Sequence, residues 1–569
     1  MRLFPLRSIR LAVCAALMLP VAMPALAQNG LAGAYLAARH ASYFNDYEAE
    51  AQFYTQALAR DPSNSDLLES ALSAFTGLGQ IDKAVPIARR IQQKAIDSQV
   101  ANMVLLANQI KRGEFAAALA DMEAGRSVGP LVDSLVVAWS HFGEGRMSEA
   151  LDAFDKAAAR PGLKAFGNYH KALALAAVGD FEGAEALFTG KDGEPLRATR
   201  RGALANVEVL SQLERDDEAV ALLDDTFGTD LDPGLAALRA ELVAGKTLPF
   251  DTIRNAADGA AEVFYTVAGA LNGEATDSYT LLYSRIAEYL RPDHADAILL
   301  SAGLLEKQQR YDLATAAYLR VPADDPAFYA AELGRAETME ESGKKEAAIE
   351  VLTQLSKTHA NVPIVHITMG DMLSRMKRYG DAIKAYDKAI ALYETPVKEH
   401  WVVYFARGIA LEREDRWKEA EADFRTALKL SPDQPRVLNY LGYSYVEKQT
   451  NLDEALDMIQ RAVALKPDDG YITDSLGWAY YHLGRYKEAV PQMEHAVELL
   501  PVDSVVNDHL GDVLWAVGRK MEARFQWRRA LSFDPDEADA ERIRRKLEVG
   551  LDKVRAEEGK EPLSVANGQ

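Results

Sequence analysis

A pattern of small residues, apolar residues and prolines recurs every 34 residues near the end of the chain. Within residues 474–501 the order is Gly477, Gly484, Ala489 and Pro501, and the same order returns one repeat later. The two copies before residues 474–501 keep a glycine, an alanine and a proline at the positions of Gly477, Ala489 and Pro501. Apolar residues at intervals of three and four form one stripe on a helix, a glycine ends the first helix, and a proline follows the second. Each copy therefore predicts two helices, which cannot bury their stripes without neighbouring copies.

An alanine in the second helix of each copy shows how far the array extends. These alanines recur at intervals of 32 to 38 residues within two series. Glu50 takes the same place in one earlier degenerate copy, and another copy with Ala268, Ala287 and Pro292 fits between the series, which makes about fourteen units. Residues 224–260 break the register and predict an irregular helical connector between a degenerate array over 28–223 and a second array over 261–535. The two series are Ala84, Ala118, Ala150, Ala184 and Ala219, then Ala314, Ala348, Ala382, Ala420, Ala455, Ala489 and Ala523.

The last four copies resemble the tetratricopeptide repeat (TPR), a helix-turn-helix unit of 34 residues. The resemblance is carried by stretches such as "LGYSYV", "DSLGWAYYHLGRYKEAVPQMEHAVELLP" and "DHLGDVLWAVGR". It implies an all-α fold, an α-solenoid in which the units form a right-handed superhelix and contact mainly their neighbours. Residues 536–558 predict a C-terminal capping helix, and residues 559–569 have too little apolar content to pack and predict a disordered tail.

The first 27 residues predict a cleaved secretory signal peptide. Three arginines precede an apolar run, and "ALA" at 25–27 is a small-x-small cleavage site. We therefore expect a mature chain that begins at Gln28 and is exported, soluble, to a bacterial periplasm. The lone Cys14 lies inside the run behind Val13, which disfavours a lipid anchor. No other stretch is long and apolar enough to predict a membrane span.

Charge and motifs disfavour nucleic-acid binding and catalysis. The formal charge of −21 becomes −24 without the three leader arginines, the opposite of what phosphate binding favours. "AGKT" at 244–247 ends like a phosphate loop, but Ala240 stands where that loop needs glycine. His509 with Asp508 and Asp512 could offer metal ligands, although a solvated histidine explains the pattern better. We expect no enzyme, no cofactor and no metal.

The first helices of the late copies carry a second stripe of aromatic and polar residues beside the core stripe. Its members are spaced three, four and three residues apart, so they share one side of each helix. In tetratricopeptide arrays the first helices line the concave side, and Tyr and Trp are favoured at binding hot spots, although the tryptophans could instead pack between adjacent helices. The acidic groups disfavour a clamp for C-terminal carboxylates. The expected protein-binding groove comprises Asn439, Tyr443, Tyr471, Asp474, Trp478, Tyr481, Asp508, Asp512 and Trp515.

Residues 362–535 are similar to the C-terminal half of bacterial envelope TPR proteins. That group includes lipoproteins that act as adaptors for a carboxyl-terminal processing protease, binding the protease and its peptidoglycan-hydrolase substrates on one scaffold. The resemblance implies a non-enzymatic periplasmic adaptor with those partners. Two alternatives remain open: an assembly or secretion factor for envelope components, and a peptidoglycan or carbohydrate binder, because Tyr and Trp stripes also stack on sugars. The sequence leaves the oligomeric state open.

Overall fold

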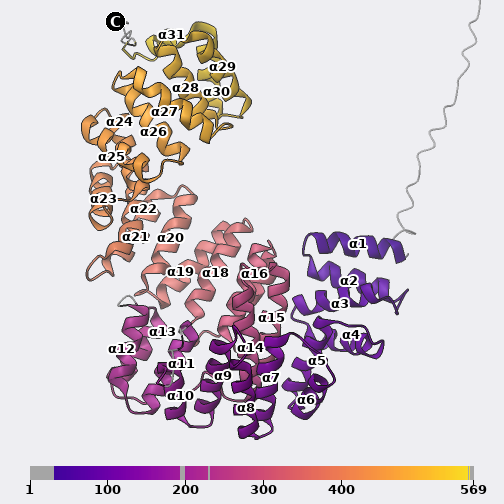
Figure 1. The fold of residues 1–569 in the computed structure, drawn as a ribbon. Helices are drawn as coiled ribbons and strands as arrows, with labels where there is room; N and C mark the ends of the chain where they lie inside the picture. The colour runs from indigo at the N-terminus through magenta and orange to yellow at the C-terminus, as the bar shows by residue number, and fades with distance from the viewer. Residues whose placement is uncertain (1–30, 192–195, 197–198, 229–230, 562, 564–569) are drawn as a thin grey trace, which may run out of the picture. The chain divides into compact units, whose positions relative to one another are not determined.

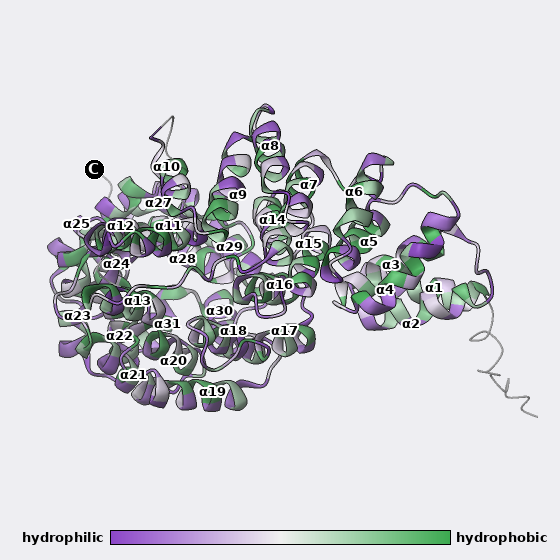
Figure 2. Ribbon diagram, turned by 90° about the horizontal axis from the view of Figure 1, so that it is seen from below, coloured by the Kyte–Doolittle hydropathy of each residue, from purple (hydrophilic) through white to green (hydrophobic). Residues whose placement is uncertain are grey.

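The computed structural model describes residues 31–191, 196, 199–228, 231–561 and 563 (Figure 1). These residues form 31 α-helices, one short 3-10 helix and no strand, which confirms the all-α expectation. Contacts between helices divide the chain into two units. The first unit ends at Ala348, and the second unit begins at Ile349. The helices carry hydrophobic and hydrophilic residues on different sides (Figure 2), as packed layers of helices require.

Most helices come in consecutive pairs joined by short turns, and α19 (Lys345–Thr358) contains the boundary between the units. The helices before it are α1 (Leu31–Tyr43), α2 (Tyr47–Leu58), α3 (Ser65–Gly77), α4 (Ile81–Gln93), α5 (Gln99–Lys111), α6 (Phe115–Glu123), α7 (Pro130–Gly143), α8 (Met147–Ala158), α9 (Lys164–Ala177), α10 (Phe181–Thr189), α11 (Arg200–Gln212), α12 (Asp216–Phe227), α13 (Pro233–Val243), α14 (Ala256–Leu271), α15 (Asp277–Leu290), α16 (Ala295–Lys307), α17 (Tyr311–Tyr318) and α18 (Phe328–Glu341).

The second unit continues the same pairing. Its helices are α20 (Pro363–Arg375), α21 (Tyr379–Ala391), the 3-10 helix η1 (Lys398–His400), α22 (Trp401–Arg413), α23 (Trp417–Leu430), α24 (Pro435–Glu447), α25 (Leu452–Leu465), α26 (Gly470–His482), α27 (Tyr486–Leu499), α28 (Ser504–Ala516), α29 (Lys520–Ser532), α30 (Glu537–Val549) and α31 (Leu551–Glu557).

The alanine register read from the sequence matches the helix pairs. All twelve alanines of the two series lie on the second helix of a pair, and each is at most 1% exposed. The first helices carry glycines at the positions that face a large side chain of the second helix. A Cβ at Gly408 would lie 2.6 Å from Phe424, and one at Gly511 would lie 2.4 Å from Trp527. Small residues therefore stand where the two helices of a repeat come closest.

The helices α14 and α15 depart from this stacking. They pack against the first helices of the early repeats, α14 against α5, α7 and α9, and α15 against α3 and α5, and both figures place them beside these helices (Figures 1 and 2). One buried apolar cluster joins Leu72 of α3 and Trp139 of α7 to Phe264 of α14 and Ile286 of α15. The hairpin thus fills the face that the early first helices leave open.

Polar contacts fix the hairpin in place. The Oη of Tyr279 donates to Gln99 Oε1 at 3.0 Å, and Asn108 Nδ2 donates to the Oη of Tyr289 at 3.0 Å. Nε of Arg285 donates to the carbonyl of Gly77 at 3.1 Å. Because these bonds join residues that are far apart in sequence, α14 and α15 are part of the first unit's interior.

The degenerate copy expected around Ala268 and Ala287 is therefore not a repeat that stacks in line. Both alanines are fully buried, but in a hairpin that lies across several earlier repeats. Residues 224–260 contain the end of α12, the helix α13 and the start of α14. The segment without helix that follows α13 lies on α11, where the amide of Leu248 donates to Ser211 Oγ at 2.9 Å.

The C-terminal cap consists of two helices rather than the single helix expected over 536–558. Gly550 separates α30 from α31 and has a φ of +85°, a conformation that suits glycine and interrupts a helix. A Cβ at Gly550 would also lie 2.6 Å from the ring of Trp515, so the break lets the chain pass closely over α28.

The signal peptide expected over 1–27, with Cys14, lies outside the described residues, as does most of the tail expected over 559–569. Among the helices that the structure describes, none is both long and apolar enough to cross a bilayer.

A methyl group on Gly259 tests the packing of α14. It would lie 2.3 Å from the buried ring of Trp139 on α7, so we expect Gly259→Ala to destabilise the first unit by about 1–3 kcal/mol. Gly269 on the same helix is exposed, with nothing near a Cβ, so Gly269→Ala should be neutral or stabilising by up to about 1 kcal/mol. Urea unfolding followed by circular dichroism compares the two, and equal effects would contradict the packing.

Candidate functional site

The stripe predicted on the late first helices lies entirely in the second unit, but its members differ in accessibility. Tyr471 at the start of α26 is exposed, and its Oη donates to Asp503 Oδ2 at 3.1 Å. Trp478 is half-buried, whereas Asp474 and Tyr481 on the same helix are buried. A partner can therefore reach the start of α26 directly and the ring of Trp478 in part.

A column of three stacked rings stands behind this surface. The ring of Trp478 lies 4.8 Å from Tyr481 and 3.9 Å from His509, nearly parallel to both. The Nε1 of Trp478 donates to Glu447 Oε1 at 3.0 Å, and Nδ1 of His509 lies 3.0 Å from a carboxylate oxygen of Asp474. Burial lowers the pKa of His509, but the carboxylate of Asp474 outweighs it and holds that pKa above its usual value.

The stripe members on α28 contact the cap helices α30 and α31. Nζ of Lys546 on α30 lies 2.7 Å from Asp508 and 2.6 Å from Asp512. Trp515 is buried, donates its Nε1 to Asp552 of α31 at 2.9 Å, and touches Gly550. Asp512 and Trp515 therefore pack beneath α30 and α31 instead of lining an open groove, because the chain itself folds over this end of the array.

The members on α24 are half-buried. Tyr443 lies near Glu447, and burial together with the carboxylates of Glu447 and Asp474 raises its pKa. The Oδ1 of Asn439 is buried and makes no hydrogen bond to any described residue. The role of this stripe in binding stays a prediction.

A row of exposed residues includes Tyr471 of the predicted site and extends beyond it to residues that the prediction left out. Four first helices of the second unit carry an apolar residue at their second position, each between 45% and 59% exposed. α24 has Arg436 at the same position. The repeat register could have revealed this row, because the spacing between copies is regular. Its apolar members are Ile364, Val402, Tyr471 and Val505.

The row adjoins a small cavity of about 110 Å³. Trp478 and His509 form one wall, and Val505, Asp508 and Arg542 line the rest with their neighbours on α28 and α30. The accessible part of the predicted stripe and the exposed row thus meet at the starts of α26 and α28.

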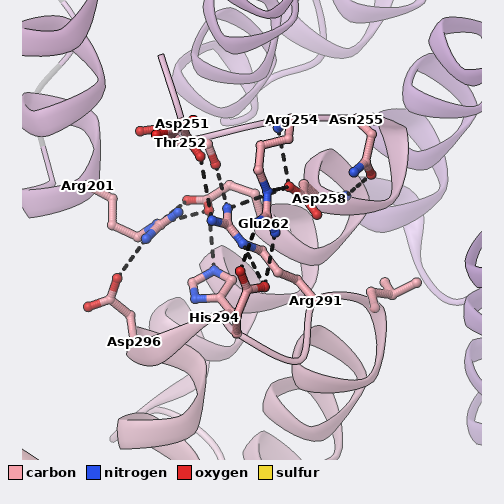
Figure 3. Close-up of polar contacts among 12 residues, drawn as sticks. Arg201, Asp251, Thr252, Arg254, Asn255, Asp258, Glu262, Arg291, His294 and Asp296 are labelled. Carbon is pink, nitrogen blue, oxygen red and sulfur yellow. Dashed lines mark hydrogen bonds and ion pairs between the residues drawn. The ribbon is translucent and has the colours of Figure 1, made fainter. Parts of the chain in front are cut away.

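The first unit contains a buried charge network that the sequence pattern did not indicate (Figure 3). Glu262 of α14 accepts hydrogen bonds from Nε of Arg201 at 2.9 Å and from Tyr169 Oη at 3.0 Å. Arg201 also donates to Asp296 of α16 at 2.7 Å. Burial raises the pKa of Glu262, but the Arg201 guanidinium outweighs burial and holds that pKa well below its usual range.

Glu208 of α11 borders this network and forms no ion pair with another residue that the structure describes. Its Oε2 accepts from the amide and the hydroxyl of Thr252 at 3.2 and 2.9 Å. Burial is the main cause that raises the pKa of Glu208 to about 7, against the hydrogen bonds from Thr252. This carboxyl therefore changes its charge near neutral pH. Within the described part of the chain no group of three or more His, Cys, Asp or Glu residues is arranged to hold a metal ion.

Two repeat-family models match the chain. Residues 471–500 match a tetratricopeptide repeat model, and residues 335–473 match the C-terminal HAT repeat model of the pre-mRNA-splicing factors Syf1 and CRNKL1. Residues 335–500 of the chain are therefore similar to tetratricopeptide and HAT repeats. Together the two models cover the chain from the second half of α18 to the end of α27, so most of the first unit lies outside both.

Similar proteins share part of this repeat array. The TPR repeat-containing protein PA4667 of Pseudomonas aeruginosa is 27% identical over 34% of this chain and 32% of its own length. Anaphase-promoting complex subunit 6 of Arabidopsis thaliana is 31% identical over 21% of this chain and 22% of its own length. The chain thus spans a third or less of these relatives.

A solved structure, the APC/C hetero-tetramer Cut9–Hcn1, aligns with 91% of this chain and 96% of its own at 15% identity and a TM-score of 0.38. The TPR protein YrrB aligns with 35% of this chain and 99% of its own at 22% identity and a TM-score of 0.28.

The raised pKa of Glu208 predicts a pH dependence of stability. Its folded pKa lies above the unfolded value, so the folded state binds more protons and the unfolding free energy of the first unit should fall as the pH rises from about 5 to 8. Glu208→Gln should remove this part of the slope and stabilise the unit at pH 8 by about 1–3 kcal/mol. Urea unfolding at both pH values measures it, and an unchanged slope would contradict the assignment.

Proposed function

We propose that this TPR array is a non-enzymatic periplasmic scaffold that binds other proteins on the first-helix face of its second unit. The observation that carries the proposal is the contrast between the units. In the first unit α14 and α15 cover the first helices, whereas among the described helices of the second unit none lies across α20, α22 and α24 in that way. Exposed apolar residues in a regular row favour contact with another protein.

The chemistry of the face fits a protein partner. Tyr471, Trp478 and Val505 supply contact area at the starts of α26 and α28, and amphipathic aromatic residues are enriched at binding hot spots. Regular spacing lets one partner contact several repeats at once. An extended face of this kind is how stacked repeats bind other proteins.

The specific role we propose is that of an adaptor for a carboxyl-terminal processing protease and its cell-wall hydrolase substrates. The support is the similarity of residues 362–535 to envelope TPR adaptors, together with the leader pattern over 1–27 that addresses the chain to the periplasm. Holding the protease and its substrate on one array raises the effective concentration of each for the other. Such an adaptor needs no catalytic group of its own.

The test compares two exposed aromatic residues of the second unit. Tyr471 lies on the proposed face, and Phe525 lies on α29, the second helix of its pair; both are more than half exposed. Tagged mature protein is incubated with periplasmic extract, and captured proteins are identified by mass spectrometry. We expect recovery of a processing protease or a cell-wall hydrolase, and we expect Tyr471→Ala to weaken its binding by about 2 kcal/mol, roughly 30-fold, while Phe525→Ala does not.

Two outcomes would contradict the proposal. Equal losses of binding affinity for Tyr471→Ala and Phe525→Ala would show that the binding face does not lie at the starts of α26 and α28. Capture of polysaccharide-synthesis or outer-membrane components without protease or hydrolase would favour an assembly or secretion factor, and sedimentation with purified sacculi in the absence of other proteins would favour a peptidoglycan binder.

A further inference from the structure

A cavity of about 520 Å³ lies within the first unit, beside the buried charge network. Its walls come from α11, from the segment before α14 and from the starts of α16 and α18. The volume is sufficient for a side chain together with part of a peptide backbone. It is separate from the binding face proposed for the second unit and does not depend on it.

The cavity continues the face that α14 and α15 cover. Arg201, Leu204 and Glu208 are spaced three and four residues apart on one side of α11 and all line the cavity. Ala184 and Ala219 fix the register between repeats, so Leu204 corresponds to Tyr169 of α9, and Tyr169 is bonded to Glu262 of α14. The hairpin therefore fills this face as far as α9 and leaves space at α11.

The lining carries more carboxyl than guanidinium groups. The three arginines are already paired: Arg200 with Asp232, Arg201 with Asp296 and Glu262, and Arg291 with Asp293. Three carboxyls have no cationic partner among the described residues, and burial is the main cause that raises the pKa of two of them, Glu208 and Asp325. A bound cation would offset the cost of their charge. These three carboxyls are Glu208, Asp251 and Asp325.

Two buried donors in the same lining also lack hydrogen bonds. His294 is 2% exposed, and its Nδ1 accepts from the amide of Ala297, so Nε2 carries the proton. That nitrogen makes no hydrogen bond, and its carboxylate neighbour, Glu262 Oε2, is 3.5 Å away. Nε of Arg291 is likewise buried without a hydrogen bond, 3.5 Å from Asp293. Both nitrogens are shielded from solvent, so they do not present a free donor to the cavity.

We propose that this cavity binds a peptide segment of a partner protein and receives one lysine or arginine side chain of that segment. The cationic head is held by Glu208, Asp251 and Asp325, which all line the cavity. Its position on the first-helix face gives a peptide access from the side on which stacked repeats bind their partners. The excess of carboxyls disfavours an anionic ligand.

The test uses three short probes and the full mature chain. Acetyl-Gly-Lys-Gly-amide and acetyl-Gly-Arg-Gly-amide carry the cation, and the same peptide with norleucine replaces the ammonium by a methyl group. Binding is followed by isothermal titration calorimetry and by protein-detected NMR. We expect saturable binding of at least one cationic probe in the millimolar range or tighter, and at least about tenfold weaker binding of the norleucine peptide.

Matched variants locate the site. Glu208→Gln and Asp325→Asn should each weaken the cationic probe by at least about fivefold, whereas Asp324→Asn, an exposed neighbour outside the lining, should not. Circular dichroism confirms that the variants remain folded. The proposal is overturned if the norleucine peptide binds equally well, if no cationic probe binds saturably, or if Asp324→Asn weakens binding as much as Glu208→Gln.

Discussion

The close approach of two helices within each repeat is the constraint on which both units depend. Glycine on the first helix has no Cβ, and alanine on the second helix has no longer side chain, so the two backbones can approach closely. A large residue of the second helix then fills the groove beside the glycine, as Phe424 does at Gly408 and Trp527 does at Gly511. This interlocking buries the apolar stripe of each repeat against its own partner and the next repeat. It also leaves the outer side of every first helix without a partner inside the repeat.

The two units differ in which helices cover that remaining face. In the first unit the chain covers it with α14 and α15, whose apolar residues join the same core as α3 and α7. In the second unit the cap helices α30 and α31 cover only the last first helix, where Lys546 meets Asp508 and Asp512. An exposed apolar row lies at the starts of α20, α22, α26 and α28 and begins with Ile364 and Val402. The first unit thus has a covered first-helix face and the second unit has an exposed apolar row, and this difference supports the proposed binding of a partner by the later repeats.

The repeat register was the part of the structure that local sequence could predict. Ala84 through Ala523 all lie where the spacing placed them, because helix pairing is a local property repeated many times. The docking of α14 and α15 was not predictable in this way. The apolar residues around Phe264 and Ile286 indicate burial, but their partners on α3, α5 and α7 lie more than a hundred residues earlier, and no periodicity specifies them. Trp515 shows the same limit: the spacing predicted it in the groove stripe, but the chain covers it after the break at Gly550.

Hydrogen–deuterium exchange of the free mature chain tests the central claim, that the first unit's face is permanently filled by its own hairpin. If α14 and α15 belong to one core with α5, α7 and α9, their amides should exchange as slowly as those of these helices and through the same cooperative opening. Exchange in α14 and α15 that is much faster than in α5 and α7, with the latter still protected, would show that the hairpin leaves the face, and the contrast between the two units would no longer hold.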